Sequence, residues 1–157
     1  MPVKPIPEGY RTLTPYLAVD DATKAIEFYG RAFGAKERSR MPAPDGKIGH
    51  AELQIGDSVV MLADQFPQSS TKPPNELGGT TVGLFLYTED VDALFKRALD
   101  AGATSSMEPA DMFWGDRFAT VTDPFGHSWQ MATHVEDLTP EEIATRGQEA
   151  MAAMAQS

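Results

Sequence analysis

The sequence predicts an α+β fold of two tandem βαβββ modules with concave mixed sheets, followed by a C-terminal helix. Three observations predict it: a strand-then-helix pattern that occurs twice, a pair of strands after each pattern, and a capped helical segment at the end of the chain. The Gly-Ala pairs that close the two helical patterns, at 34–35 and 102–103, lie about 68 residues apart. Repeats of this length usually mean that neither half buries its sheet alone.

The first strand-then-helix pattern covers residues 13–36. Leu13, Leu17 and Val19 alternate as in a strand, and Asp20-Asp21 can cap the helix that follows. The second pattern covers residues 82–103, with Glu89-Asp90 at the start of its helix. Gly34 and Gly102 are expected to end the two helices. The apolar stripes are Ala25, Ile26, Tyr29 and Phe33 in the first helix and Leu94, Phe95, Ala98 and Leu99 in the second.

Two further strands follow each helix. Residues 50–64 form a strand pair around Gly-Asp, and residues 118–134 form one around Asp-Pro-Phe-Gly. Another strand fits near 36–41 and near 103–108. We therefore expect one domain over 1–137, with module 1 at about 10–65, a Pro-rich linker at 65–79 and module 2 at about 80–137. The tail 138–157 opens with Thr139, Pro140 and Glu142, a capping box that predicts a helix.

Composition excludes several classes of function. The chain of 157 residues has no cysteine, so it cannot form disulfides or thiolate metal sites, and this fits a reducing compartment. Its formal net charge of −10 disfavours nucleic acid and anionic membranes as partners. The N-terminus lacks the apolar core of a secretion signal, and no apolar run approaches the ~20 residues of a membrane span. We expect a cytoplasmic protein.

Strand parity predicts which side chains face away from the helices, on the concave side of each sheet. For the strand at 58–64 both faces are apolar, and we predict Val59 and Met61 on the helix side with Val60 and Leu62 on the concave side. The other predicted concave residues are Thr14, Tyr16, Ala18, His50, Glu52 and Gln54 in module 1, and Gly83, Phe85, Tyr87, Phe118, Thr120, Thr122, Ser128, Gln130 and Ala132 in module 2.

This lining of aromatic and polar groups is typical of a small-molecule site. Trp114, in the loop before the Phe118 strand, is either a loop anchor or a stacking platform. Arg117 is either an ion-pair partner of Asp116, Asp123 or Glu108, or a ligand contact. His50 and Glu52 lie two apart on one strand face, where they can hydrogen-bond each other or chelate a metal with a third ligand.

The order of several motifs resembles the vicinal oxygen chelate superfamily, which includes glyoxalase I, extradiol dioxygenases and the bleomycin- and fosfomycin-resistance proteins. The resemblance covers residues 10–135 and is strongest to the PhnB-like branch. It is carried by Tyr16-Leu-Ala-Val, AIEFYGRAFGA, His50-Ala-Glu-Leu, Trp114-Gly-Asp-Arg and Asp123-Pro-Phe-Gly-His. The resemblance implies a metal held by one side chain from each of four strands, at positions near Thr14, Val60, Gly83 and Gln130. Only Gln130 offers a useful donor there, so no metal at this site and no cofactor are expected.

Three functions follow from these observations. The first is a metal-free protein that binds a small molecule through Tyr16, Gln54, Phe85, Tyr87, Trp114, Phe118, Thr120 and Gln130. The second is a lyase or isomerase in which Glu52 and His50 are catalytic, with or without a divalent metal; as a general base, Glu52 would need a raised pKa. The third is a scaffold without chemistry. Exposed module edges favour a homodimer, in which the helix after Thr139 could hold the partner.

Overall fold

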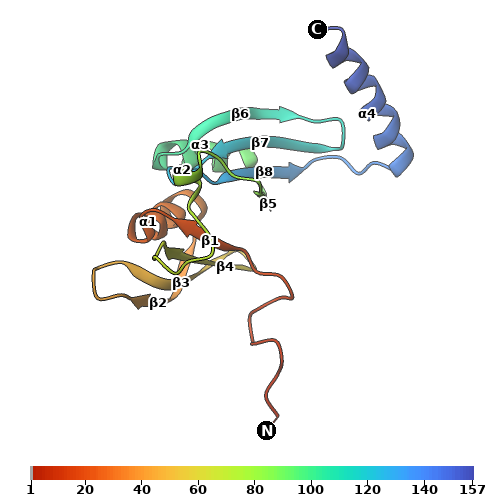
Figure 1. The fold of residues 1–157 in the computed structure, drawn as a ribbon. Helices are drawn as coiled ribbons and strands as arrows, with labels where there is room; N and C mark the ends of the chain where they lie inside the picture. Colours follow the sequence, from red (N-terminus) through yellow and green to blue (C-terminus); the bar gives the residue numbers. More distant parts are fainter. Residues whose placement is uncertain (1) are drawn as a thin grey trace.

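The computed structural model describes residues 2–157 and confirms the predicted fold of two βαβββ modules (Figure 1). Module 1 consists of β1 (Tyr16–Val19), α1 (Ala22–Phe33), β2 (Lys36–Pro42), β3 (Ile48–Ile55) and β4 (Ser58–Asp64). Module 2 consists of β5 (Gly83–Tyr87), α3 (Val91–Ala101), β6 (Thr104–Asp111), β7 (Asp116–Thr122) and β8 (Ser128–His134). The short helix α2 (Pro74–Leu77) lies in the linker, and α4 (Pro140–Ala155) is the C-terminal helix.

The two sheets have the same strand order. They run β1-β4-β3-β2 and β5-β8-β7-β6, so β1 and β5 are corresponding edge strands. The pairs β1–β4 and β5–β8 are parallel and the other pairs are antiparallel, which makes both sheets mixed. Cross-strand partners lie on the same face of a sheet, so this pairing shows which side chains share the concave faces.

The predicted helix ends are confirmed. In each acidic pair before a helix, the second residue is the N-cap. The Asp21 carboxylate accepts a hydrogen bond from the Lys24 backbone N–H at 3.1 Å, and the Asp90 carboxylate accepts one from the Ala93 backbone N–H at 3.0 Å. Gly34 and Gly102 end the helices at positive φ. These caps fix where each helix begins and ends above its sheet.

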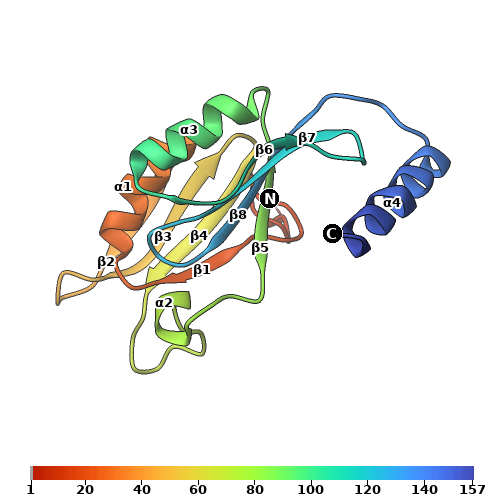
Figure 2. The same cartoon turned by 90° about the horizontal axis from the view of Figure 1, so that it is seen from above.

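One hydrophobic core is shared by both modules. Helices α1 and α3 lie side by side at one end of the two sheets in both views (Figures 1 and 2). The core joins buried side chains of α1 and α3 to those of β1, β3, β4, β7 and β8. Within it, the Tyr29 hydroxyl of α1 donates to Asp123 of module 2 at 2.6 Å, and Trp129 Nε1 donates to the same carboxyl at 2.9 Å. The concave faces therefore lie on the sides of the sheets that point away from this core.

The predicted faces hold for β3, β7 and β8 but are wrong for β4. Met61 pairs with Tyr16 and with Glu52, and Val59 pairs with Gln54, so Val59 and Met61 belong to the concave side. Val60 and Leu62 instead join the core under α1. Because four consecutive apolar residues carry no alternation, the sequence could not decide their parity.

The first strand of each module is shorter than predicted. Leu13 was expected to belong to the first strand, but it precedes β1 and is 86% exposed. Val82 likewise precedes β5 and is 65% exposed. Both apolar side chains therefore lie outside the core of the single chain.

Helix α4 points away from both sheets (Figures 1 and 2). It begins with the predicted capping box, in which Thr139 accepts from the Glu142 N–H and Glu142 accepts from the Thr139 N–H. Gly147 is its one buried residue and lies against the Phe113 ring. Over residues 2–157, none of the helices combines the length and the apolar character of a membrane span.

Candidate functional site

The concave face of module 1 carries a chain of three hydrogen-bonded side chains. The Tyr16 hydroxyl lies 2.8 Å from His50 Nδ1, and His50 Nε2 lies 3.2 Å from a Glu52 oxygen. The expected hydrogen bond between His50 and Glu52 is thus present. An ionised Glu52 can only accept, so in neutral His50 the proton is on Nε2 and Nδ1 accepts from Tyr16.

Glu52 is held in its ionised form. A hydrogen bond from Tyr10 is the largest cause that lowers the pKa of Glu52, with further contributions from His50 and Arg38 against opposing desolvation. The Arg38 guanidinium lies 5.2 Å from the centre of the Tyr10 ring. The direction of this pKa shift is opposite to the one that a general base needs at neutral pH.

The segment before β1 lies beside this face. Its residues Pro5, Ile6, Pro7, Tyr10, Arg11 and Thr12, together with Glu52 and Met61, line a cavity of about 500 Å³. Gln54, two residues beyond Glu52, accepts weakly from Arg38 at 3.4 Å and donates to the Gly56 carbonyl at 2.9 Å. Of the module 1 site residues, Tyr16, His50 and Glu52 form one connected group, and Gln54 lies beside it.

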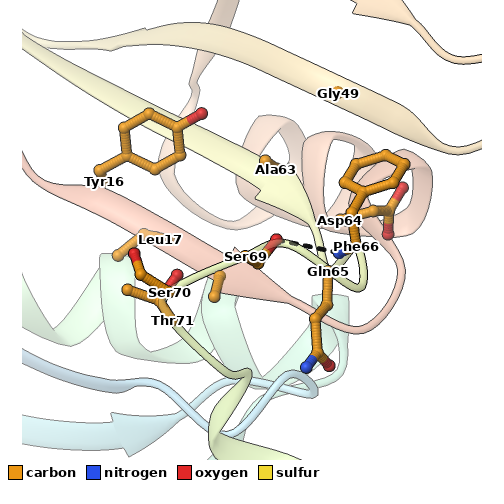
Figure 3. A pocket seen from close by; sticks show the side chains of 11 residues that line it. Tyr16, Leu17, Gly49, Ala63, Asp64, Gln65, Phe66, Ser69, Ser70 and Thr71 are labelled. Atoms are coloured by element: carbon orange, nitrogen blue, oxygen red, sulfur yellow. Dashed lines mark hydrogen bonds between the residues drawn. The ribbon is translucent and has the colours of Figure 1, made fainter.

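A second cavity, of about 290 Å³, is lined by Tyr16. Figure 3 shows the Tyr16 and Phe66 rings on opposite sides of Ala63, with the segment 69–71 along a third side. Its base includes Ala18 and Ala63, which are paired in register on β1 and β4. The side chains there are small, so the sheet surface is hollow at this point.

The concave face of module 2 is aromatic rather than titratable. Phe85 lies 5.2 Å from Tyr87 and 5.8 Å from Phe118, and Phe118 lies 5.5 Å from Trp114 between ring centres. We call these four residues the aromatic row. Phe85 is 46% exposed and Tyr87 63% exposed, so the row presents ring faces to solvent in the single chain.

Both ends of the aromatic row, Tyr87 and Trp114, are held by Asp116, a buried carboxylate. Tyr87 donates to it at 2.9 Å, Trp114 Nε1 donates at 3.0 Å, and His134 Nδ1 lies at 2.8 Å. The hydrogen bonds of His134 to Asp116 and then to Asp137 raise the His134 pKa. Of the two interpretations of Trp114, its indole N–H bond supports an anchor, and its edge contact with Phe118 keeps it in the row.

Thr120 and Gln130 are register partners on β7 and β8, on the same face as Phe85. The Gln130 amide lies across Gly83, where an added Cβ would be 3.1 Å from Gln130 Nε2. With the β4 parity corrected, Met61 replaces Val60 among the four positions that the family pattern implied. A thioether, a threonine, a glycine and one amide do not make a divalent metal site. Within residues 2–157, no three His, Asp or Glu side chains converge as metal ligands.

Arg117 forms ion pairs, but with partners that the sequence did not indicate. Its guanidinium contacts Asp92 through two nitrogens at 2.6 and 2.9 Å, and Asp111 at 3.1 Å. Asp92 is on α3 and Asp111 on β6, so both partners are close in space but outside the expected set. Arg117 therefore ties α3 to the sheet of module 2.

Two groups of site residues result, one in each module. The contacts given above for Tyr16, His50, Glu52 and Gln54 stay within module 1 and the segment before it, and those of Phe85, Tyr87, Phe118 and Trp114 stay within module 2. Because the two concave faces point away from the shared core, one copy of the chain does not bring the groups together.

Comparison with known proteins gives the family. Residues 11–131 match the model of the Glyoxalase/Bleomycin resistance protein/Dioxygenase superfamily. The chain belongs to this superfamily. The match covers both modules and ends in β8, before α4 begins.

Relatives of this superfamily chain include an uncharacterized protein of Mycobacterium bovis, 48% identical over 134 residues that cover 83% of this chain and 88% of the relative. Among solved structures, TioX from Micromonospora sp. ML1 is 31% identical with a TM-score of 0.64, over 80% of this chain and 99% of that one. A PhnB protein from Bacillus cereus, titled a putative 3-demethylubiquinone-9 3-methyltransferase, is 19% identical with a TM-score of 0.62, over 78% and 99%. This last likeness shows the fold alone.

Several residues of the two faces were not predicted. Tyr10 and Arg38 come from segments without a motif, and the hydroxyls of 69–71 lie in a stretch that reads only as a linker. His134 and Asp116 are 18 residues apart in sequence but are register partners. For this pair a signal existed, because extending the first strand of the predicted hairpin at 118–134 by two residues places Asp116 opposite His134.

Proposed function

We propose that this protein binds a small molecule in a site built from two copies of the chain, without the metal of its superfamily. The concave face of module 1 in one copy would meet that of module 2 in the other, because each face is open and its groups are complementary. One face supplies the Tyr16–His50–Glu52 chain and the other the aromatic row. Such a combination of stacking surface and a few polar groups is typical of ligand sites.

The exposure of the concave aromatic residues is the observation that carries this proposal. Tyr16 is 53% exposed, Phe85 46% and Tyr87 63%, although all three belong to ordered strands. Exposed aromatic side chains on the concave faces of both modules favour an interaction site on each face. In a two-fold dimer the same contact occurs twice, so two equivalent sites would form.

The oligomeric state tests the proposal directly. Sedimentation equilibrium of the wild-type chain should show a dimer at micromolar concentration. Phe85→Lys should weaken the dimer at least tenfold, since a charge would be placed in the interface. Leu77→Lys is the matched control, because Leu77 is 63% exposed on α2 and outside both faces. A monomeric wild-type chain, or equal effects of the two substitutions, would overturn the composite site.

An acid–base enzyme is the second candidate, and the hydrogen bonds of His50 favour it. Glu52 orients the imidazole and Tyr16 presents a hydroxyl to it, an arrangement that suits proton transfer. The lowered pKa of Glu52 makes a positioning role more suitable for this carboxylate than that of the base. Metal analysis of the purified protein distinguishes a metal-dependent enzyme from a metal-free one. Stoichiometric metal that is lost in His50→Ala would favour a metal-dependent lyase or isomerase.

The cytoplasmic location stays a prediction.

A further inference from the structure

We infer that the cavity between Tyr16 and Phe66, at one end of the concave face of module 1, is a binding site for a small, uncharged ring compound with a hydrogen-bonding substituent. We call it the linker pocket; its lining consists of Tyr16, Leu17, Ala18, Gly49, Ala63, Asp64, Gln65, Phe66, Ser69, Ser70 and Thr71. All of these residues belong to one copy of module 1 and the start of the linker. The lining is therefore complete within one copy and does not need the aromatic row of a partner, although the pocket shares Tyr16 and the concave face of module 1 with the composite site.

The shape of the linker pocket suits a single ring. Its volume of about 290 Å³ exceeds that of a cavity of roughly 150 Å³ that accepts benzene. The Tyr16 and Phe66 rings stand on opposite sides of Ala63 (Figure 3). A planar ligand above Ala18 and Ala63 would thus lie between two aromatic walls.

The walls of the linker pocket are fixed before any ligand arrives. The Phe66 N–H donates to Ser69 Oγ at 3.0 Å, and the Ser69 N–H donates to the Phe66 carbonyl at 2.9 Å. Lys47 Nζ lies 5.6 Å from the centre of the Phe66 ring and donates to the Gln65 carbonyl at 3.3 Å. The following prolines, Pro73 and Pro74, are buried. A preorganised wall lowers the entropic cost of binding.

The charges of the linker pocket exclude a charged ligand. Asp64 is its one ionisable lining group besides Tyr16, and both Asp64 oxygens are occupied by the backbone N–H groups of Ala22 at 2.9 Å and Ile48 at 2.8 Å. Asp64 follows Ala63 on β4, so its buried carboxylate lies on the helix side of the sheet with Val60 and Leu62 and not in the pocket. An anion would find no cationic partner and a cation no carboxylate inside the pocket, so either would lose hydration without compensation. The hydroxyls of Ser70 and Thr71 can donate to or accept from a neutral substituent.

Three probes of similar shape and different charge test this inference: benzamide, benzoate and benzamidinium. Titrations followed by amide shifts in NMR spectra, in about 150 mM salt to screen the net charge, locate each probe. Benzamide should shift the amides of Ala63, Ser69 and Thr71 with a Kd on the order of 1 mM, as expected for so few atoms. Benzoate and benzamidinium should bind at least tenfold more weakly at these amides.

Two pairs of variants assign the binding to the linker pocket. Ala63→Leu fills it and should weaken benzamide binding at least tenfold, whereas Ala144→Leu on the exposed surface of α4 should not. Thr71→Val keeps the volume but removes a hydroxyl, and should weaken binding severalfold relative to Thr145→Val on α4. Thr71→Val keeps the test open if Ala63→Leu impairs folding.

The inference is overturned if benzamide causes no shifts at Ala63, Ser69 and Thr71, if a charged probe binds there as well as benzamide, or if neither pocket variant weakens binding. Shifts at Phe85 and Phe118 instead would place the probe on the aromatic row and leave only the composite site. Binding that persists in Phe85→Lys, where the dimer is expected to dissociate, would support the linker pocket independently of the dimer.

Discussion

Tyr10 lowers the pKa of Glu52 from a segment outside both sheets. Its hydrogen bond is the largest cause of the lowered Glu52 pKa, while the same bond raises the Tyr10 pKa. The carboxylate therefore stabilises the folded chain above the unfolded pKa, near the ordinary value of 4.5, and this contribution is lost as the pH falls through the lower folded pKa. At neutral pH the His50 ring faces a permanent negative charge.

Substitution of Tyr10 tests this dependence at the level of one residue. In Tyr10→Phe the Glu52 pKa should rise towards or above 4.5, because the strongest bond to the ionised form is gone. Carbon NMR titration of the Glu52 carboxyl measures it. Tyr16→Phe is the control, since Tyr16 contacts His50 and not Glu52, and it should move the Glu52 pKa much less. A Glu52 pKa that is the same in Tyr10→Phe and the wild type would contradict the assignment.

At the scale of elements, the sequence determined some strands better than others. Glu52 and Gln54 alternate with buried Ala51 and Leu53, so the faces of β3 could be predicted. The apolar run of β4 gave no alternation, and its faces were fixed only by pairing with β1 and β3. The linker pocket could not be predicted from the sequence either. It forms only because residues 65–71 fold back over β1 and β4, and no local sequence pattern indicates that this segment does so.

The connection from module 2 to α4 depends on Gly115. It adopts φ +99°, its carbonyl accepts from the N–H groups of Val135 and Glu136 at 3.0 Å, and an added Cβ would overlap the Glu136 carbonyl. Gly115→Ala should therefore lower the free energy of unfolding by about 2–4 kcal/mol, the sum of backbone strain and overlap.

Gly46→Ala is the matched control for Gly115. Gly46 has φ +82°, and an added Cβ there meets no atom within 4 Å. Its substitution should cost only the backbone strain, about 1 kcal/mol. Urea unfolding measures both variants, and equal losses would show that the close approach to Glu136 is unimportant.

For the whole molecule, the buried carboxyl of Asp123 holds the modules together. It accepts from Tyr29 and Trp129 and from the N–H groups of Phe125 and His127, both at 2.9 Å. Of the hydrogen bonds to Asp123, only the one from Tyr29 comes from α1 of module 1, and Tyr29→Phe removes it. This substitution should lower the free energy of unfolding by about 1.5–3 kcal/mol, because the acceptor is charged and buried. Tyr87→Phe also removes a tyrosine bond to a buried aspartate, but Tyr87 is 63% exposed. Its cost in urea unfolding should be smaller; the reverse order would refute the role of Asp123.

The arrangement of the modules leads to the central claim. A shared core on the helix side leaves two different concave faces open, one with titratable groups and one with aromatic groups. The sequence predicted which residues belong to each face apart from β4, but not whether one copy of the chain brings the two faces together. Their separation follows from the packing of α1 against α3, which no sequence pattern revealed.

Cross-linking of single-cysteine variants tests this claim most directly, because the chain has no cysteine of its own. Gln54→Cys labels the face of module 1 and Thr120→Cys that of module 2. When the two variants are mixed and allowed to exchange, a short bismaleimide should join Gln54→Cys of one copy to Thr120→Cys of another in preference to pairs of the same variant. Cross-links mainly between identical variants, or none between copies, would contradict a site built from the two different faces.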